Sequence, residues 1–188
     1  MKIIAFALAT ATALALTATT ASAEGLRVEV HGGWDRVSNS GVEEDGILYG
    51  IGAGYDVAIG ENAFVGIDLS ADLSSGEDCA EDVIANGDEA CVSVRRDLAA
   101  GVRAGVNVTP STSIYALAGY TNARFRVDYT TAANVTTRTS ENLDGLRVGA
   151  GVQQAFGNGA YGKVEYRYSN YEAGTDRHNV LVGVGFMF

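Results

Sequence analysis

The stretch HNVLVGVGFMF, residues 178–188, alternates between two kinds of side chain. Bulky apolar residues take every second position from Val180 to Phe188. The positions between them hold Leu181, Gly183, Gly185 and Met187. A repeat of two residues is the side-chain period of a β-strand. The sequence therefore predicts a C-terminal strand with one bulky apolar face and one face rich in small residues.

The same alternation recurs upstream, and no long window shows the period of an amphipathic helix. We expect eight strands, at residues 26–34, 47–59, 63–71, 94–108, 113–129, 143–155, 160–171 and 178–188. The connections between them alternate in length. Tight turns rich in turn-forming residues lie at 60–62, 109–112 and 156–159, and longer polar stretches lie at 35–46, 73–92, 130–142 and 172–177. This layout predicts an all-β, eight-stranded antiparallel up-and-down transmembrane β-barrel.

The composition of the two faces indicates which side points to lipid. The less apolar faces are rich in glycine, at positions 50, 52, 54, 66, 101, 105, 149, 151, 183 and 185. Glycine weakens a strand, and a water-facing side has no need of it. The interior of an eight-stranded barrel is narrow, and small residues beside a few long ones fit it. We therefore expect the aliphatic faces outside, although a soluble barrel with the apolar face inside is the alternative.

The N-terminus has the pattern of an export signal. A single early cation, Lys2, precedes an apolar run from Ile3 to about Leu16, and small residues ending in Ala21-Ser22-Ala23 follow it. We expect a cleaved signal peptide at residues 1–23 and one barrel domain at residues 24–188. An uncleaved membrane anchor is the alternative, but the apolar run is shorter than the ~20 residues that a spanning helix needs.

The charge of the chain argues against nucleic acid as a partner. The formal net charge is −10, and without a basic surface a protein cannot neutralise many phosphates. Acidic residues gather in the expected loops, but their spacing does not match the calcium-loop pattern. We expect no metal and no cofactor.

Two cysteines, Cys79 and Cys91, lie in one of the long polar stretches. Export leads to an oxidising compartment, where a disulfide between them is expected. A metal site is the weaker alternative, because two thiolates without a nearby histidine do not complete a zinc site.

The expected inward faces carry a set of charged residues, which we predict to form an interior network. Its members are Asp56, Asp68, Arg103, Arg124, Arg147, Lys163, Glu165 and Arg167. Isolated buried charges are costly, so these side chains must pair inside a narrow barrel. The network would close the lumen and stabilise the fold.

Three segments resemble the small outer-membrane β-barrel family of Gram-negative bacteria, which includes the OmpA transmembrane domain and the opacity-type surface antigens. They are GVGFMF at 183–188, KVEYRYSNY at 163–171 and SIYALAGYTNARF at 113–125, and the resemblance extends over essentially the whole mature chain. It implies a place in the cell outer membrane among lipid and lipopolysaccharide. It also implies that Phe186 and Phe188 belong to a signal read by the barrel-assembly machinery. The OmpA likeness further suggests a switchable ion gate as the alternative role of the interior network.

For function, we expect a structural or surface protein that stabilises the envelope or presents its loops to an extracellular partner. The stretch 73–92 is the best candidate contact surface. A narrow porin-like channel for ions or small solutes is the alternative. A lipid-modifying enzyme is less favoured, because Ser169 and His178 fall on opposite faces and no Gly-x-Ser-x-Gly motif occurs. We therefore expect no enzyme.

Overall fold

The computed structural model describes residues 25–39, 42–82, 84, 86–133 and 135–188. The predicted signal peptide at residues 1–23 lies outside the described residues and stays a prediction. Among the described residues, no helical segment is both long enough and apolar enough to cross a membrane.

The described chain is built almost entirely of antiparallel strands. They are β1 (Gly25–Asn39), β2 (Val42–Ile59), β3 (Ala63–Ser74), β4 (Glu77–Glu81), β5 (Glu89–Asn107), β6 (Thr112–Thr130), β7 (Thr136–Gly157), β8 (Ala160–Tyr171) and β9 (Thr175–Met187). A 3-10 turn, η1 (Glu172–Gly174), joins β8 to β9.

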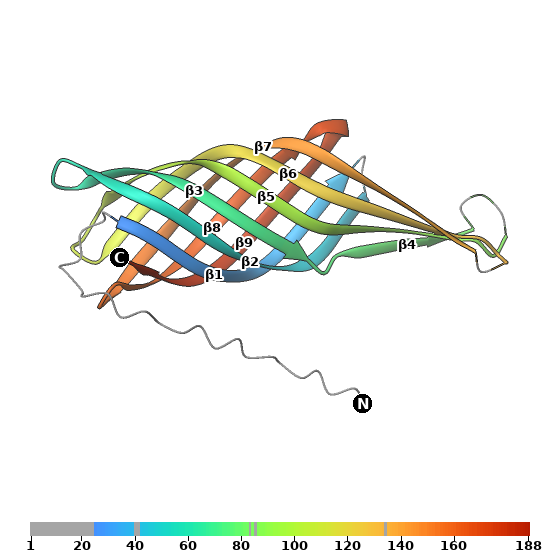
Figure 1. The fold of residues 1–188 in the computed structure, drawn as a ribbon, viewed down its shortest axis with the longest axis horizontal. Coiled ribbons are helices and arrows are strands. Elements are labelled where there is room, and N and C mark those ends of the chain that lie inside the picture. Colours follow the sequence, from blue (N-terminus) through green and yellow to red (C-terminus); the bar gives the residue numbers. More distant parts are fainter. Residues whose placement is uncertain (1–24, 40–41, 83, 85, 134) are drawn as a thin grey trace, which may run out of the picture.

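Eight of these strands form a closed ring, as the sequence predicts. The order is β3-β2-β1-β9-β8-β7-β6-β5, and pairing of β3 with β5 closes it. The C-terminal strand β9 pairs with β1 from Arg27↔Met187 to Asn39↔Thr175, so the chain's last strand seals the barrel. Figure 1 shows the tilted strands and the C-terminus at the end that carries the tight turns. At one of these turns, Asn158 has φ 53°, a left-handed conformation that asparagine tolerates.

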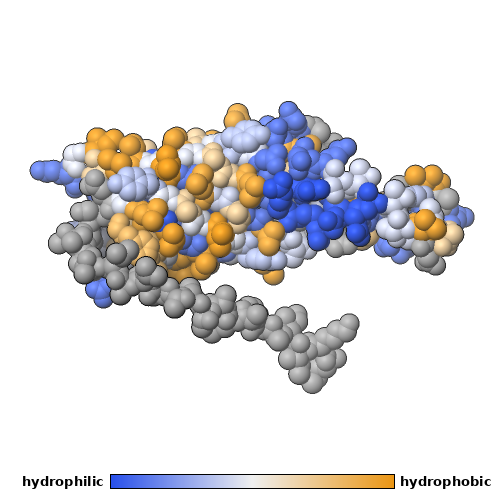
Figure 2. Space-filling model, in the orientation of Figure 1, coloured by the Kyte–Doolittle hydropathy of each residue, from blue (hydrophilic) through white to orange (hydrophobic). Residues whose placement is uncertain are grey.

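On every ring strand except β6, the two faces point as predicted. On β9, Val182 is 61% exposed on the outside, whereas Leu181 beside it is 1% exposed in the interior. The outer face of the barrel is a belt of exposed aliphatic and aromatic side chains, whose most hydrophobic members form the orange zone of Figure 2. Exposure of so much apolar surface to water would be unfavourable, and lipid is the solvent that suits it.

One predicted face is wrong, that of the strand at 113–129. We expected Tyr115 and Leu117 outside and Tyr120 inside. In the structure Tyr115 is 4% exposed in the lumen, and Tyr120 is 50% exposed on the outside. The physical reason is that both faces of β6 carry apolar residues, so alternation alone does not set the phase. Tyr115 can lie in a polar lumen because its hydroxyl donates a hydrogen bond to Glu165 Oε2 at 2.5 Å.

Most of the predicted long loops are also wrong, because the strands continue through them. Paired strand extends to Asn39↔Val42 between β1 and β2, and to Thr130↔Thr136 between β6 and β7. Threonine and valine are common in these polar stretches and favour extended backbone. The result is a sheet that projects beyond the ring, on the right of Figure 1. We call it the projecting sheet, and it comprises residues 77–81, 89–96, 124–130 and 136–144.

Candidate functional site: the charged lumen

The interior of the ring is lined by charged side chains that are almost fully removed from solvent. They are Arg27, Glu29, His31, Asp35, Asp56, Asp72, Asp97, Arg103, Arg147, Lys163, Glu165, Arg167 and Arg177. Asp68 joins them with a side chain that is slightly exposed. Strand alternation places these groups inward, and each must find a partner there because unpaired buried charge is costly.

Near the tight-turn end, Asp56 lies between two arginines. Arg27 Nε lies 2.9 Å from Asp56 Oδ2, and Arg103 approaches the same carboxylate from β5 through Nε and Nη2. The Arg103 guanidinium also lies over the ring of Tyr115, 4.9 Å from its centroid, a cation–π arrangement. Arg27 reaches on to Asp68 Oδ2 at 2.8 Å. This group therefore joins β1, β2, β3, β5 and β6.

The middle of the lumen holds Lys163 between two glutamates. Its Nζ lies 2.5 Å from Glu29 Oε1 and 3.1 Å from Glu165 Oε2. Tyr161 donates a hydrogen bond to Glu29 at 2.8 Å, and Arg167 donates from Nε to Glu165. Each carboxylate thus has several donors, which is the condition under which a buried charge is tolerated.

Toward the projecting sheet, two aspartates connect three arginines. Asp72 Oδ2 lies 3.1 Å from Arg167 Nη1 and 3.5 Å from Arg147 Nη1. Asp97 Oδ2 lies 2.5 Å from Arg147 Nη2 and 2.7 Å from Arg177 Nη1.

Arg177 ends the series in a bidentate ion pair with Asp35. Its Nε lies 2.7 Å from Oδ1 of that carboxylate, and its Nη2 lies 2.7 Å from Oδ2. Asn179 donates to the same carboxylate at 2.7 Å. Paired parallel hydrogen bonds of this kind are the strong geometry for arginine and carboxylate.

These contacts form one continuous chain of ion pairs along the lumen. It runs Asp56–Arg27–Glu29–Lys163–Glu165–Arg167–Asp72–Arg147–Asp97–Arg177–Asp35, with no step longer than 3.9 Å. His31 lies beside the chain, with Nε2 2.5 Å from Asp72 Oδ1 and Nδ1 3.4 Å from Glu29 Oε1. The imidazole of His31 therefore adds a further positive charge to the lumen when both of its nitrogens are protonated.

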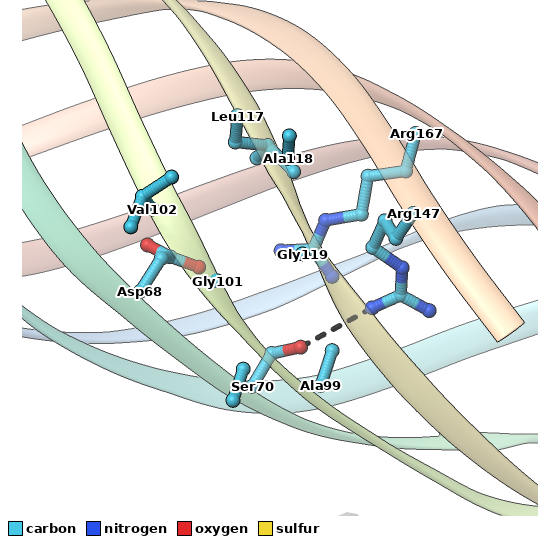
Figure 3. A pocket seen from close by; sticks show the side chains of 11 residues that line it. Asp68, Ser70, Ala99, Gly101, Val102, Leu117, Ala118, Gly119, Arg147 and Arg167 are labelled. Carbon is cyan, nitrogen blue, oxygen red and sulfur yellow. Dashed lines mark hydrogen bonds between the residues drawn. The ribbon is translucent and has the colours of Figure 1, made fainter. Parts of the chain in front are cut away.

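These side chains leave a small cavity between them. A cavity beside Asp68, Ser70, Arg147 and Arg167 measures ≈ 10 Å³, about the room that one water molecule needs. Figure 3 shows the two arginines and Asp68 converging on it, with Arg147 Nη1 bonded to Ser70 Oγ at 3.3 Å. A larger hollow of about 650 Å³ is lined by Tyr55, Val65, Ile67 and Val102 among others, four residues that belong to the exposed outer belt.

The structure places seven of the predicted network residues inside the barrel: Asp56, Asp68, Arg103, Arg147, Lys163, Glu165 and Arg167. The prediction for the eighth, Arg124, is wrong, because this residue is exposed on the outer face of β6. This follows directly from the inverted assignment of the two faces of that strand.

The prediction also missed several members of the network: Arg27, Glu29, Asp35, Asp72, Asp97 and Arg177. Arg27, Glu29 and Asp97 occupy inward positions of predicted strands, so alternation was a usable signal for them. Asp35 and Arg177 lie in stretches expected to be loops, and Asp72 lies just beyond the expected end of its strand. No strand signal pointed to these three.

Ser169 and His178 do not form a nucleophile and base pair. Ser169 is fully buried in the lumen and accepts a hydrogen bond from Arg147 Nε at 2.9 Å. His178 lies on the outer face, where its Nδ1 is 2.7 Å from the hydroxyl of Tyr166.

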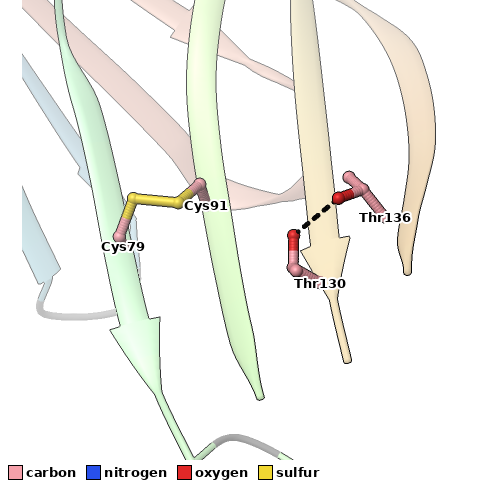
Figure 4. The surroundings of a disulfide bond; sticks show 4 residues. All are labelled: Cys79, Cys91, Thr130 and Thr136. Atoms are coloured by element: carbon pink, nitrogen blue, oxygen red, sulfur yellow. Dashed lines mark hydrogen bonds between the residues drawn. A yellow bond between two sulfur atoms is a disulfide. The ribbon is translucent and has the colours of Figure 1, made fainter. Parts of the chain in front are cut away.

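In the projecting sheet, Cys79 on β4 is joined to Cys91 on β5 by a disulfide, shown in Figure 4. The two sulfurs, with Glu89, form the cluster of potential metal ligands found among the described residues, but thiols joined to each other are not available as thiolate ligands. Tyr129 on β6 donates a hydrogen bond to Asp88 at 2.5 Å, and this bond raises the pKa of the phenol. The disulfide joins β4 to β5, and the Tyr129–Asp88 bond attaches the segment between these two strands to β6.

An apolar outer belt, a closed ring of tilted strands and an ionic interior together define a transmembrane β-barrel. The chain belongs to the outer membrane protein β-barrel domain family, whose model matches residues 4–188. The family points to the outer membrane as the location. No curated protein sequence matches the chain significantly.

Two solved structures show the same fold. One is Ail, the attachment invasion locus protein of Yersinia pestis, solved with the heparin analogue sucrose octasulfate. It is 16% identical with a TM-score of 0.60, and the match covers 88% of this chain and 99% of Ail. The other is Neisserial surface protein A, also 16% identical with a TM-score of 0.58, and its match covers 87% of this chain and 97% of that one. At this level of identity the similarity extends to the fold alone.

Proposed function

We propose that the protein is a surface-exposed barrel of a Gram-negative outer membrane that binds an extracellular protein through its projecting sheet. On this proposal, export uses the cleaved signal at residues 1–23, and the barrel-assembly machinery reads the terminal Phe186 and Phe188. The barrel anchors the sheet, and the sheet makes the contact. The single observation that carries the proposal is the free edge of β7.

The N-terminal part of β7 has a neighbour on one side only. Residues 136–144 pair with β6, but β8 ends at Tyr171, which pairs with Gly145. The backbone N–H and C=O groups on the open side are therefore available to another extended strand. The segment reads TTRTSENLD and contains neither proline nor glycine, the residues that commonly disrupt an edge.

The far end of the projecting sheet is apolar, which supports the same role. Ile84 is 79% exposed and Val135 is 59% exposed. Figure 2 shows orange patches at this end, separated from the lipid-facing belt by a hydrophilic band. Exposed apolar residues far from the lipid belt are typical of protein contact surfaces.

The names of the two similar proteins are consistent with a surface role, since one is called an attachment invasion locus protein and the other a surface protein. A role in envelope stability is the second form of the proposal. The continuous ion-pair chain favours it, because such a chain connects strands on opposite sides of the barrel.

The test removes the outer part of the edge, residues 136–139, and keeps the barrel. Residues 127–139 are replaced by Asn-Gly, which joins Arg126 to Ser140, its partner in the β6–β7 register, by a two-residue hairpin turn. The control is Thr137→Ser with Thr139→Ser, which alters side chains on the edge and leaves its backbone unchanged. Cells that display each form are tested for binding to a panel of immobilised extracellular-matrix and serum proteins.

We expect the wild type and the serine control to bind a member of the panel and the shortened form to lose at least nine-tenths of that binding. Amides of residues 136–144 should also become protected from hydrogen exchange in the complex. Equal binding by the shortened form contradicts the edge as the contact. If no member of the panel binds the wild type, the envelope role is favoured instead.

A further inference from the structure

Four arginines form a patch where the projecting sheet leaves the ring: Arg95, Arg96, Arg124 and Arg126. We call them the arginine patch. Arg95 lies at a β-bulge between Val94 and Arg96, and the others come from the paired strands β5 and β6. Within the described part of the chain, these are the arginines without an ion pair. The remaining ones each have a carboxylate within 4.0 Å.

The arrangement of the patch is unfavourable without a bound anion. Arg96 and Arg124 are directly opposite each other in the β5–β6 register, and like charges in such positions repel. Arg126 lies two residues further along the same face of β6. Its Nε is shielded from solvent and has no hydrogen-bond acceptor among the described residues, which costs free energy that a ligand oxygen would recover.

The patch lies at the border of the lipid-facing belt. Leu98 is the next outward residue after Arg96 on β5, and two residues along a strand span about 7 Å. On β6, the lipid-facing Tyr120 lies four residues before Arg124. In Figure 2 the hydrophilic band directly adjoins the orange zone. With the projecting sheet outside the cell, the arginine patch therefore lies at the depth of the headgroups of the outer leaflet.

We propose that the arginine patch binds the phosphate groups of an outer-leaflet glycolipid of the lipopolysaccharide type. Guanidinium groups match phosphate oxygens in paired hydrogen bonds. One phosphate between Arg96 and Arg124 would remove their repulsion, and a second acceptor oxygen would satisfy Arg126. A membrane lipid is favoured over a soluble anion because the patch is continuous with the apolar belt, which would contact the acyl chains of the same molecule.

This inference goes beyond the binding of an extracellular protein and depends only on the position of the barrel in the membrane. The test uses the mature full-length chain refolded in phosphatidylcholine vesicles. Its heat-unfolding midpoint is measured with added lipid A, with dephosphorylated lipid A, and with sucrose octasulfate or inorganic phosphate in solution. The variant is Arg96→Gln with Arg124→Gln. The matched control is Arg36→Gln with Arg138→Gln, which removes the same charge from two arginines that have carboxylate partners.

For the wild type and the control, we expect lipid A to raise the midpoint and dephosphorylated lipid A to have little effect. The patch variant should need at least tenfold more lipid A for the same shift. In neutral detergent without lipid A it should unfold at the wild-type temperature or above it, because a repulsion has been removed, and this shows that the variant folds.

Two outcomes overturn the proposal. One is an equal response of the patch variant and the wild type to lipid A. The other is an equal response of the wild type to phosphorylated and dephosphorylated lipid A. A shift of the same size with the soluble anions reassigns the patch to a soluble polyanion and overturns the lipid as its ligand. Loss of protein binding after removal of the β7 edge is a separate measurement, so the two proposals fail independently.

Discussion

Arg177 on β9 and Asp97 on β5 meet across the lumen, with Nη1 2.7 Å from Oδ2. The two strands are not neighbours in the ring, since β6, β7 and β8 lie between them. Asp97 also accepts hydrogen bonds from Arg147, Tyr171 and Thr121. One carboxylate therefore holds together β5, β6, β7, β8 and β9, in addition to the backbone ladder.

Replacement of Asp97 should be strongly destabilising. Asp97→Ala leaves Arg147 and Arg177 each with one carboxylate fewer inside the barrel, and loss of a buried partner costs about 3–5 kcal/mol. The matched control is Asp128→Ala, which removes a partly exposed carboxylate paired with the exposed Arg138 and should cost no more than about 1 kcal/mol. Equilibrium unfolding by urea in vesicles measures both. Equal effects of the two substitutions would contradict a structural role for the lumen chain.

A glycine of the lumen should not tolerate a side chain. A Cβ on Gly52 would lie 2.7 Å from Glu29 Oε1 and 2.8 Å from Glu29 Cγ. Gly52→Val should therefore displace Glu29 from Lys163 and destabilise the barrel by about 1–3 kcal/mol or more, as overpacking does. Ala53→Val is the control, because the next residue along β2 faces outward. The heat-dependent change in gel migration should shift to lower temperature for the first variant and stay unchanged for the second.

The disulfide should stabilise the projecting sheet and not the ring. A closed loop of this length contributes about 3 kcal/mol in the chain-entropy model, but Cys79 and Cys91 connect only β4 and β5. Cys79→Ser with Cys91→Ser should leave the unfolding temperature of the barrel unchanged and speed proteolysis within residues 77–93. If the variant lowers the unfolding temperature of the barrel and leaves proteolysis unaltered, the disulfide stabilises the ring and the prediction is wrong.

The filled lumen should not conduct ions as an open pore. The chain of ion pairs crosses the lumen, and the cavity beside Asp68, Ser70, Arg147 and Arg167 has room for about one water molecule. Refolded protein in planar bilayers should show no discrete conductance steps at neutral pH. Regular steps at low voltage would favour the narrow channel over a closed anchor.

Sequence patterns alone predict the ring of strands and the faces of most of them. Alternation works on β2 because Ile51 and Tyr55 face lipid while Gly52 and Asp56 face the lumen, so the two faces differ in both size and polarity. It fails on β6, where Tyr115 fills the lumen and Tyr120 faces outward. A tyrosine suits either place, since its ring contacts lipid or neighbouring rings while its hydroxyl finds a carboxylate.

The extent of the strands could not be predicted from the same patterns. Above the lipid belt both faces of a strand meet water, so the apolar and polar alternation disappears while the backbone pairing continues. Asp35 and Arg177 lie just below this zone, buried at the end of the lumen network, in stretches where the apolar and polar alternation is already lost. Their partnership depends on the stagger between β1 and β9, which only the three-dimensional structure shows.

The most direct test of the account compares Val65 and Phe64, successive residues at the same depth on β3. Val65 is 41% exposed on the outside and Phe64 is 2% exposed in the interior. In a Trp34→Phe background, which removes the single native tryptophan, Val65→Trp and Phe64→Trp each introduce one fluorophore. In vesicles of lipids brominated along their acyl chains, we predict strong quenching of the tryptophan at 65 and little quenching at 64. Strong quenching at 64 with none at 65 would contradict the orientation on which the lumen network, the lipid belt and the arginine patch all depend.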